Sequence, residues 1–200
     1  MSDLTYCVDL GRLEYASALA LQHRVVAARQ EGRLPDVLLL VEHDPVITLG
    51  RRGDPRHILA SAEVLERAGI AVHPAERGGD VTYHGPGQLV GYPIIRLEEH
   101  HLGAADYMHR LEDVLLAALA DLGVAARRRD GIVGVWIGSD KVAALGVRIE
   151  RGVSYHGFAL NVNVNLGHFA LIVPCGITDG GVTSLDRVLG RPVDWATVQG

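Results

Sequence analysis

The sequence is short of the residues on which several protein classes depend. Two cysteines in 200 residues, Cys7 and Cys175, are too few for a disulfide framework, and the chain begins without the charged and apolar segments of a secretory leader. No stretch approaches the ~20 consecutive apolar residues of a membrane-spanning helix. We therefore expect a cytoplasmic protein with free thiols and no membrane partner.

Several catalytic and binding motifs are also missing. The sequence has neither G-x-x-x-x-G-K-[ST] nor a G-x-G-x-x-G that opens a helix, so no nucleotide cofactor is expected. It lacks H-E-x-x-H and C-x-x-C, which leaves its ten histidines without a metal-binding pattern. The G-x-S-x-G elbow and the papain-type cysteine motif are absent. A net charge of −5 argues against general nucleic-acid binding.

The residues that are present indicate one α+β domain over residues 1–200. A hydrophobic content of 48% and a mean hydropathy of +0.16 are typical of a compact globular protein. Apolar spacing predicts helices at residues 15–29 and 104–122, and Ser61 caps a short helix that Gly69 ends. Strands are expected at residues 4–9, 37–42, 46–49, 70–74, 81–83 and 89–97, followed by a mostly antiparallel meander at 132–137, 141–145, 147–150 and 155–163.

The most informative segment is residues 77–88, which read RGGDVTYHGPGQ. Four glycines and a proline lie there between two strand-like stretches. Because glycine has no Cβ, such a run can bring main chain close to a ligand or to another strand. A simple tight turn would not also contain Arg77, Tyr83 and His84. The segment therefore predicts part of a binding site.

Cys175 is a candidate nucleophile because of its neighbours, Pro174 and Gly176. The proline stiffens the chain before the thiol, and the glycine leaves its far side open to a substrate. An exposed amide at this point would also stabilise an oxyanion. A buried, inert thiol is the alternative interpretation. Cys7 has no such setting and is interpreted as inert.

Lys141 follows a turn and begins an apolar strand. A desolvated lysine has a lowered pKa and can act as a base, and beside a thiol its charged form favours the thiolate. Taken alone, the local sequence favours a solvated lysine at the end of a strand. His84 and His156 each precede a glycine after a strand-like run. Either ring can orient a substrate, pair with the thiol, or be a hydrogen-bonded core histidine.

Four ordered blocks of the sequence resemble the lipoyl(octanoyl) transferase family. The blocks are residues 77–88 with 89–93 after them, residues 134–136 leading to Lys141 and 144–146, residues 156–161, and residues 174–176. They span nearly the whole chain. The resemblance implies the fold of the biotin/lipoyl protein ligases, which is a mixed β-sheet flanked by helices.

The resemblance also implies a ping-pong octanoyl transfer without ATP, metal or cofactor. Cys175 would carry the octanoyl group as a thioester, and Lys141 would lower the pKa of the thiol and accept a proton from the attacking amine. His156 is a possible supporting residue. The implied substrate-binding residues are Arg77, Gly78, Gly79, Asp80, Val81, Thr82, Tyr83, His84, Ala144, Leu145, Gly146, Gly157, Phe158 and Ala159.

The implied partners are octanoyl-acyl carrier protein as donor and, as acceptors, the lipoyl domains of 2-oxoacid dehydrogenase complexes and the glycine cleavage H protein. The reaction would be the first step of endogenous lipoate synthesis. Because carrier proteins are acidic, a basic patch is expected to dock the donor. The arginine run 127–129 is the first candidate, Arg51 with Arg52 forms a second basic pair, and a solvated loop is the alternative for the run.

Two other functions remain open from the sequence. An ATP-dependent lipoate- or biotin-protein ligase of the same fold would share the glycine-rich loop and the lysine, but it would not need Cys175. A non-catalytic module that binds octanoyl groups or lipoyl domains would keep the pocket without needing Lys141 and Cys175 together.

Overall fold

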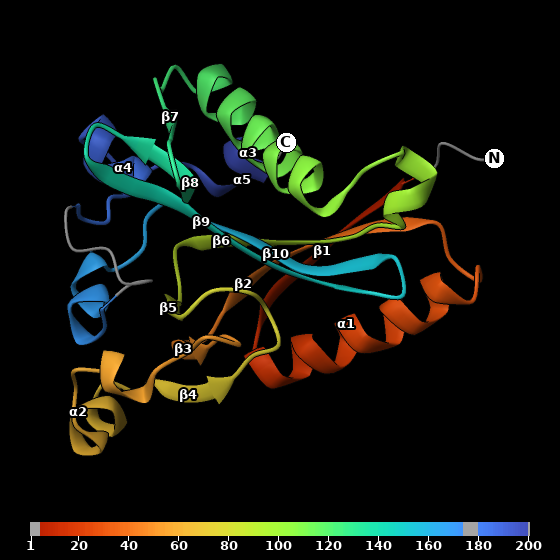
Figure 1. Ribbon diagram of the computed structural model, residues 1–200. Helices are drawn as coiled ribbons and strands as arrows, with labels where there is room; N and C mark the ends of the chain where they lie inside the picture. The colour runs from red at the N-terminus through yellow and green to blue at the C-terminus, as the bar shows by residue number, and fades with distance from the viewer. Residues whose placement is uncertain (1–4, 174–179, 200) are drawn as a thin grey trace.

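The computed structural model describes residues 5–173 and 180–199, which fold into two β-sheets with helices around them (Figure 1). The large sheet has the strand order β1-β2-β6-β10-β9-β8-β7, and the small sheet has the order β4-β3-β5. The strands are β1 (Thr5–Leu13), β2 (Asp36–His43), β3 (Val46–Leu49), β4 (Ala71–Pro74), β5 (Val81–His84), β6 (Gln88–Ile94), β7 (Arg127–Arg129), β8 (Ile132–Ile137), β9 (Asp140–Glu150) and β10 (Val153–Asn161).

The large sheet is mixed, as predicted. Strands β1 and β2 run parallel, whereas each remaining neighbouring pair in that sheet is antiparallel. The α-helices are α1 (Tyr15–Gln30), α2 (Ala62–Arg67), α3 (Ala104–Asp121), α4 (Leu185–Leu189) and α5 (Trp195–Gln199). Figure 1 shows α1 on one face of the sheet and α3 on the other. The α+β prediction with flanking helices is therefore confirmed.

Each face of the large sheet carries its own apolar core. Beneath α1, Ala18 and Val26 pack against β2, β6 and β10. On the opposite face, Leu115 and Leu119 of α3 pack against β8 and β9 together with Leu185 of α4. The four-residue spacing of the α3 leucines places them on one side of the helix, because an α-helix has about 3.6 residues per turn. The sheet is consequently covered on both sides.

Two predicted strand boundaries were wrong for identifiable reasons. The strand predicted to break at Gly146 is continuous in β9, because Gly146 pairs directly with Gly157 of β10 and neither glycine interrupts the ladder. Strand β6 ends at Ile94, and Leu97–His100 forms a 3₁₀ turn instead of continuing the strand. The arginine run, for which a solvated loop was the alternative interpretation, forms edge strand β7, which pairs with β8.

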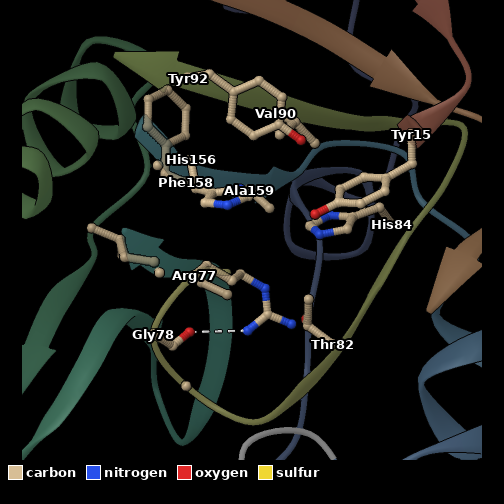
Figure 2. A pocket seen from close by; sticks show the side chains of 15 residues that line it. Tyr15, Arg77, Gly78, Thr82, His84, Val90, Tyr92, His156, Phe158 and Ala159 are labelled. Carbon is tan, nitrogen blue, oxygen red and sulfur yellow. Dashed lines mark hydrogen bonds between the residues drawn. The ribbon is translucent and has the colours of Figure 1, made fainter. Parts of the chain in front are cut away.

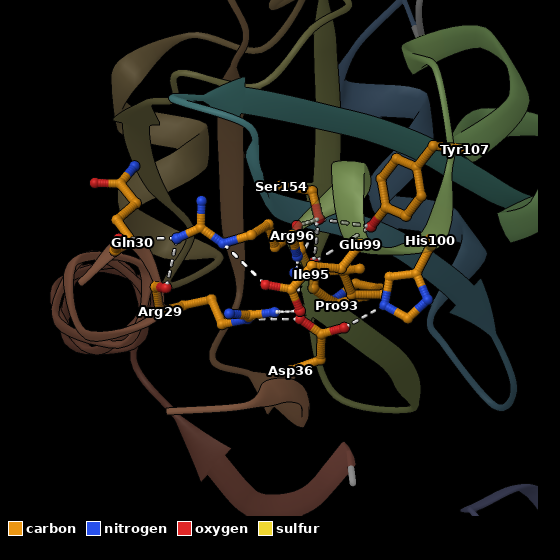
Figure 3. Close-up of polar contacts among 10 residues, drawn as sticks. All are labelled: Arg29, Gln30, Asp36, Pro93, Ile95, Arg96, Glu99, His100, Tyr107 and Ser154. Atoms are coloured by element: carbon orange, nitrogen blue, oxygen red, sulfur yellow. Dashed lines mark hydrogen bonds and ion pairs between the residues drawn. The ribbon is translucent and has the colours of Figure 1, made fainter. Parts of the chain in front are cut away.

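A buried ion-pair cluster ties the end of α1 to the start of β2 (Figure 3). Asp36 accepts hydrogen bonds from Arg29 Nε at 2.7 Å, from the Arg96 amide at 3.0 Å and from His100. Despite burial, these bonds hold the pKa of Asp36 below its usual value. Arg29 also binds Glu99, in the 3₁₀ turn. The cluster fixes the end of the sheet at which β2 begins.

The two sheets join through the turn between β5 and β6. Gly87 has a φ of +83°, and a Cβ placed on it would lie 2.5 Å from the main chain of Asn163. The Gly87 carbonyl accepts from the amides of Val162 at 3.0 Å and Asn163 at 2.8 Å. Only glycine fits this close backbone approach. The sequence run 77–88 therefore leads from a loop into β5 and crosses to β6, an interior strand of the large sheet.

A glycine-to-alanine change in the sheet tests how closely its strands are packed. A Cβ on Gly157 would lie 2.2 Å from the Gly91 carbonyl oxygen, which belongs to the rigid backbone of β6. We expect Gly157→Ala to lower the free energy of unfolding by about 1–3 kcal/mol in urea denaturation. Gly103→Ala is the control, because its Cβ would meet only the end of the Asp106 side chain at 3.3 Å. Equal losses in both variants would contradict this packing.

Candidate active site

A pocket lies where the glycine-rich loop meets the large sheet (Figure 2). Its walls come from the loop that begins at Arg77 and from β5, β6, β9 and β10, with the first residue of α1 above them. The enclosed part of the pocket is narrow, with a volume of about 40 Å³. The lining residues are Tyr15, Arg77, Gly78, Gly79, Thr82, His84, Val90, Tyr92, Ala144, Leu145, Gly146, His156, Gly157, Phe158 and Ala159.

The glycine-rich loop lies directly on β9 through backbone contacts. The Gly78 amide donates to the Val147 carbonyl at 3.0 Å. A Cβ on Gly146 would lie 3.0 Å from the Gly78 carbonyl oxygen, so the strand has no side chain where the loop crosses it. The pocket is therefore bounded by main chain at this end, which explains why glycines occur in both segments.

Arg77 is held by the small sheet. Its Nη2 donates to Thr48 Oγ1 at 2.7 Å and to the Thr48 carbonyl at 2.8 Å, and its Nη1 donates to the Gly78 carbonyl at 3.1 Å. Only 7% of the residue is exposed. The guanidinium thus braces the loop against β3 and brings a fixed positive charge to the pocket wall.

Two buried polar atoms on the pocket wall have no hydrogen-bond partner within residues 5–173 and 180–199. They are the Tyr15 hydroxyl oxygen and His156 Nε2. Burial raises the pKa of Tyr15 to about 12, so the hydroxyl keeps its proton. Figure 2 shows the Tyr15 ring above His84, and the two ring planes are 7° apart. Unpaired buried polar groups are costly, and these two are available to a ligand or a water.

The protonation of His84 follows from its neighbours. The Gln88 amide nitrogen donates to the Tyr83 carbonyl and to Asn161 Oδ1, so Gln88 Oε1 is left to accept from His84 Nδ1 at 2.7 Å. Nδ1 therefore carries the proton, and Nε2 is an acceptor. Burial, with the charge of Arg77 nearby, lowers the pKa of both His84 and His156 to about 3. Both rings are neutral at pH 7.

Most of the predicted substrate-binding residues line this pocket, but three of them do not. Asp80 lies behind the loop, where it pairs with His57 and accepts from the Asp54 amide at 3.0 Å. Val81 belongs to the core of the small sheet. The Tyr83 ring packs in that same core, and its hydroxyl hydrogen-bonds His168 Nδ1 at 2.7 Å. The alternation of β5 leaves Thr82 and His84 on the pocket side.

Three lining residues were missed from the sequence. Val90 and Tyr92 lie two residues apart on β6, so their side chains are on the same face of the strand. The strand expected directly after the glycine-rich run could therefore have identified both residues. Tyr15 comes from the start of α1, far from the run in sequence, and it had no such signal. Its place depends on the way α1 packs across the sheet.

Lys141 lies at the start of β9 and is the only lysine in the sequence. It is 7% exposed, and its Nζ lies 4.9 Å from the centroid of the buried Trp136 ring. The solvated-lysine interpretation is therefore wrong. Lys141 does not line the pocket itself, but the same strand supplies Ala144, Leu145 and Gly146 to the pocket wall.

Cys175 lies outside the described residues, as do Pro174 and Gly176. The described chain on both sides of this segment is anchored. The Val173 amide donates to the His57 carbonyl at 2.8 Å, and the Lys141 amide donates to the Gly181 carbonyl at 3.0 Å. The Thr183 amide in turn donates to the Lys141 carbonyl at 3.0 Å.

The arginine run 127–129 is largely occupied by internal contacts. Arg128 donates to Glu112 at 2.9 Å and to Asp113 at 2.6 Å. The Arg129 guanidinium lies 5.1 Å from the centroid of the Trp136 ring. Arg127 remains exposed, and its Nη2 donates to the Gly138 carbonyl. The run therefore presents less available positive charge than its sequence indicates.

Within the described parts of the chain, no cluster of three or more His, Cys, Asp or Glu side chains has the arrangement of a metal site. Among the helices of those same parts, none combines the length and the apolar character that crossing a membrane requires.

The buried histidines predict how stability changes with pH. The unfolded chain protonates each ring near pH 6.5, whereas the folded protein protonates His84 and His156 only near pH 3. Their contribution to stability is complete above pH 6.5 and is lost as the pH falls. We expect the free energy of unfolding to decrease by up to about 1.4 kcal/mol per pH unit for each ring between pH 6.5 and 4.

Chemical denaturation of His156→Asn at several pH values measures this contribution, and the slope should become shallower. Asparagine tolerates the left-handed backbone of His156, whose φ is +54°. His101→Asn is the matched control, because His101 is exposed and has a φ of +55°. An unchanged slope in His156→Asn would contradict the neutral, buried state of this ring.

Comparison with known proteins places the chain in a family. The family model for the lipoyl protein ligase A/B catalytic domain matches residues 14–200. An octanoyltransferase of Alkaliphilus metalliredigens is 49% identical over 94% of this chain and 87% of its own length. An octanoyltransferase of Solibacter usitatus is 52% identical over 85% of this chain and 77% of its own length.

Solved structures share the fold at low sequence identity. A lipoate-protein ligase A bound with ATP superposes with a TM-score of 0.81, at 16% identity, over all of this chain and 81% of its own. A biotin protein ligase from Aquifex aeolicus gives 0.58 at 14% identity, over 96% and 65% of the two chains. The chain belongs to the lipoyl protein ligase A/B catalytic domain family and groups within it with the octanoyltransferases, so it is an acyltransferase.

Proposed function

We propose that this protein transfers an octanoyl group from acyl carrier protein to a lysine of a lipoyl domain, through a thioester on Cys175. The observation that carries the proposal is the position of Lys141. The only lysine of the chain is buried at the start of the strand that forms one wall of an apolar pocket. The relatives at about half identity are named octanoyltransferases, and an apolar pocket is compatible with binding an octanoyl chain.

In the first step, the Cys175 thiolate attacks the thioester carbonyl of octanoyl-carrier protein. A new C–S bond forms to Cys175, the bond to the carrier sulfur breaks, and the departing carrier thiolate takes a proton from the Lys141 ammonium, which becomes neutral. The positive charge of Lys141 favours the cysteine thiolate before the attack. One thioester replaces another, so the step is nearly balanced in energy and needs no nucleotide.

In the second step, the lysine amine of the acceptor attacks the Cys175 thioester. The C–N bond forms, the C–S bond breaks, and the proton of the amine passes to neutral Lys141 or to the departing cysteine sulfur. Amide formation from a thioester is downhill. In the proposed mechanism the thiol and the lysine amine interact directly, so the pair would have shared apparent pKa values.

The pocket suits the octanoyl tail. Val90, Leu145, Phe158 and Ala159 form its apolar part, and each buried CH₂ group contributes about 0.8 kcal/mol to binding. Neutral His84 and His156 add no charge to the wall. We propose that the thioester end lies toward Lys141 and the methyl end lies toward Tyr15.

An ATP-dependent ligase is the main alternative, because the shared fold includes enzymes bound with ATP. At 16% identity that likeness concerns the fold alone. A ligase would activate the free acid as an adenylate, and it would need no thiol. A non-catalytic octanoyl- or lipoyl-domain-binding module would keep the pocket but would not require the buried lysine. The proposed setting is the cytoplasm, where both protein partners would meet the enzyme.

Intact-protein mass spectrometry tests the acyl-enzyme. After incubation with octanoyl-carrier protein and no nucleotide, we expect one adduct of octanoyl mass that is absent in Cys175→Ala and present in Cys7→Ala. Lys141→Ala should lose amide formation by a hundredfold or more, on the order expected for loss of a general base. An adduct that survives in Cys175→Ala, or amide formed only with ATP, would exclude the mechanism.

We propose that the acidic carrier protein docks at the basic pair Arg51 and Arg52. Arg51 and Arg52 are exposed, and neither side chain has a hydrogen bond or ion pair within the described residues. Their amides donate to the Arg77 and Gly79 carbonyls at 3.0 and 3.1 Å, so the pair lies on the pocket loop.

We expect Arg51→Glu/Arg52→Glu to raise the KM for octanoyl-carrier protein several-fold at low salt, with little change in kcat and a smaller effect at high salt. Arg127→Glu, on the exposed end of the arginine run, is the comparison variant. A larger effect from Arg127→Glu would place the docking surface at the β7 edge instead.

A further inference from the structure

Glu112 is a buried carboxylate that the proposed reaction does not use. It lies on α3, only 4% of the residue is exposed, and Leu111 and Leu115 are buried on either side of it. Its Oε1 accepts from the Gly134 amide at 2.9 Å, and its Oε2 accepts from Arg128 Nε at 2.9 Å. Burying a carboxylate costs free energy unless its oxygens are paired. Its burial here indicates that a nearby buried donor requires a hydrogen-bond acceptor at this position.

The need arises from an irregularity in β8. Arg127 of β7 pairs with Trp136, and Arg129 pairs with Ile132, so β8 uses two more residues than β7 over this stretch. Gly134 lies inside the irregular stretch with a φ of +141°, and its amide donates to Glu112. A buried amide must find an acceptor. Glu112 supplies that acceptor from the helix above the sheet.

Gly134 in turn lies against the stem of Lys141. A Cβ on Gly134 would be 2.9 Å from Lys141 Cε and 3.3 Å from Cδ, so the lysine stem passes directly over the glycine. The pairing of β8 with β9 also shifts at this point, since Val135 pairs with Ala143 and Trp136 pairs with Lys141. Such bulges re-aim a side chain. The same short stretch of β8 thus supports the lysine stem through Gly134 and its ammonium through Trp136.

We infer that Glu112 is a positioning residue for Lys141. By holding the Gly134 amide, it fixes the irregular stretch of β8 and so sets where the lysine ammonium lies against the Trp136 ring. The inference rests on the proposed function in that it gives Lys141 a part in catalysis. The inferred effect of Glu112 on Lys141 is indirect: the carboxylate holds the Gly134 main chain, and the β8 stretch that contains Gly134 and Trp136 contacts the lysine.

Two substitutions separate geometry from charge. Glu112→Gln keeps an oxygen acceptor at the same reach and removes the negative charge. Glu112→Asp keeps the charge and withdraws the acceptor by one methylene from Gly134. Positioning predicts that Glu112→Gln resembles the wild type and that Glu112→Asp is impaired. Asp113→Asn is the matched control, because it removes the other carboxylate on Arg128 and leaves Gly134 untouched.

The single lysine makes a direct readout possible. Protein labelled with [ε-¹³C]lysine gives one lysine ε-CH₂ signal, and the Trp136 ring should displace its proton resonance upfield of free lysine. We expect the displacement to persist in Glu112→Gln and Asp113→Asn and to shrink by half or more in Glu112→Asp. A wild-type shift in folded Glu112→Asp, or a lost shift in Glu112→Gln, would overturn the inference.

Kinetics form the second readout. We expect Glu112→Asp to lower kcat for transfer to the lipoyl domain about tenfold or more with KM nearly unchanged, since small misplacements of a catalytic group cost this much. The experiments distinguish failure of the proposed role of Lys141 from failure of the inferred role of Glu112. If Lys141→Ala transfers normally, the proposed role of the lysine fails while the NMR result still reports on Glu112. If Lys141→Ala is inactive and Glu112→Asp keeps both the wild-type shift and rate, the inference fails alone.

Discussion

The pocket depends on one backbone contact, the crossing of Gly78 over β9. Because the Gly78 amide bonds the Val147 carbonyl and Gly146 has no side chain beneath it, the loop lies within contact distance of the sheet. A Cβ on Gly146 would press on the Gly78 carbonyl and lift the loop. Arg77 then braces the loop against Thr48 of the small sheet. The apolar slot follows from the absence of side chains at this crossing.

The polar groups around the pocket divide into two sets with different physical states. His84 and His156 are desolvated and neutral, so they line the wall without adding charge. Lys141 and Arg77 supply the positive charge, and each is restrained, Arg77 by Thr48 and Lys141 by Trp136 and the β8 stretch that Glu112 supports. An acyl tail and a reacting thioester need these two environments side by side.

The sequence predicted the parts of this arrangement that depend on local pattern. Helix α3 follows from its leucine spacing, and residues of the glycine-rich run line the pocket, as expected of a segment that predicts part of a binding site. The prediction failed where tertiary contacts decide the structure: Gly146 does not end its strand, and Tyr15 reaches the pocket from the start of α1. The local sequence favoured a solvated Lys141, although its being the only lysine beside many arginines is a compositional signal.

In the proposed mechanism, a fold shared with a lipoate-protein ligase bound with ATP transfers octanoyl without a nucleotide, through Cys175 and Lys141. The most direct measurement is a single-turnover chase. Octanoyl-enzyme is purified away from carrier protein and nucleotide and then mixed with a lipoyl domain. We predict that the octanoyl mass leaves the enzyme and appears as an amide on the lipoyl-domain lysine in equal amount. An adduct that remains on the enzyme until ATP is added would contradict the account.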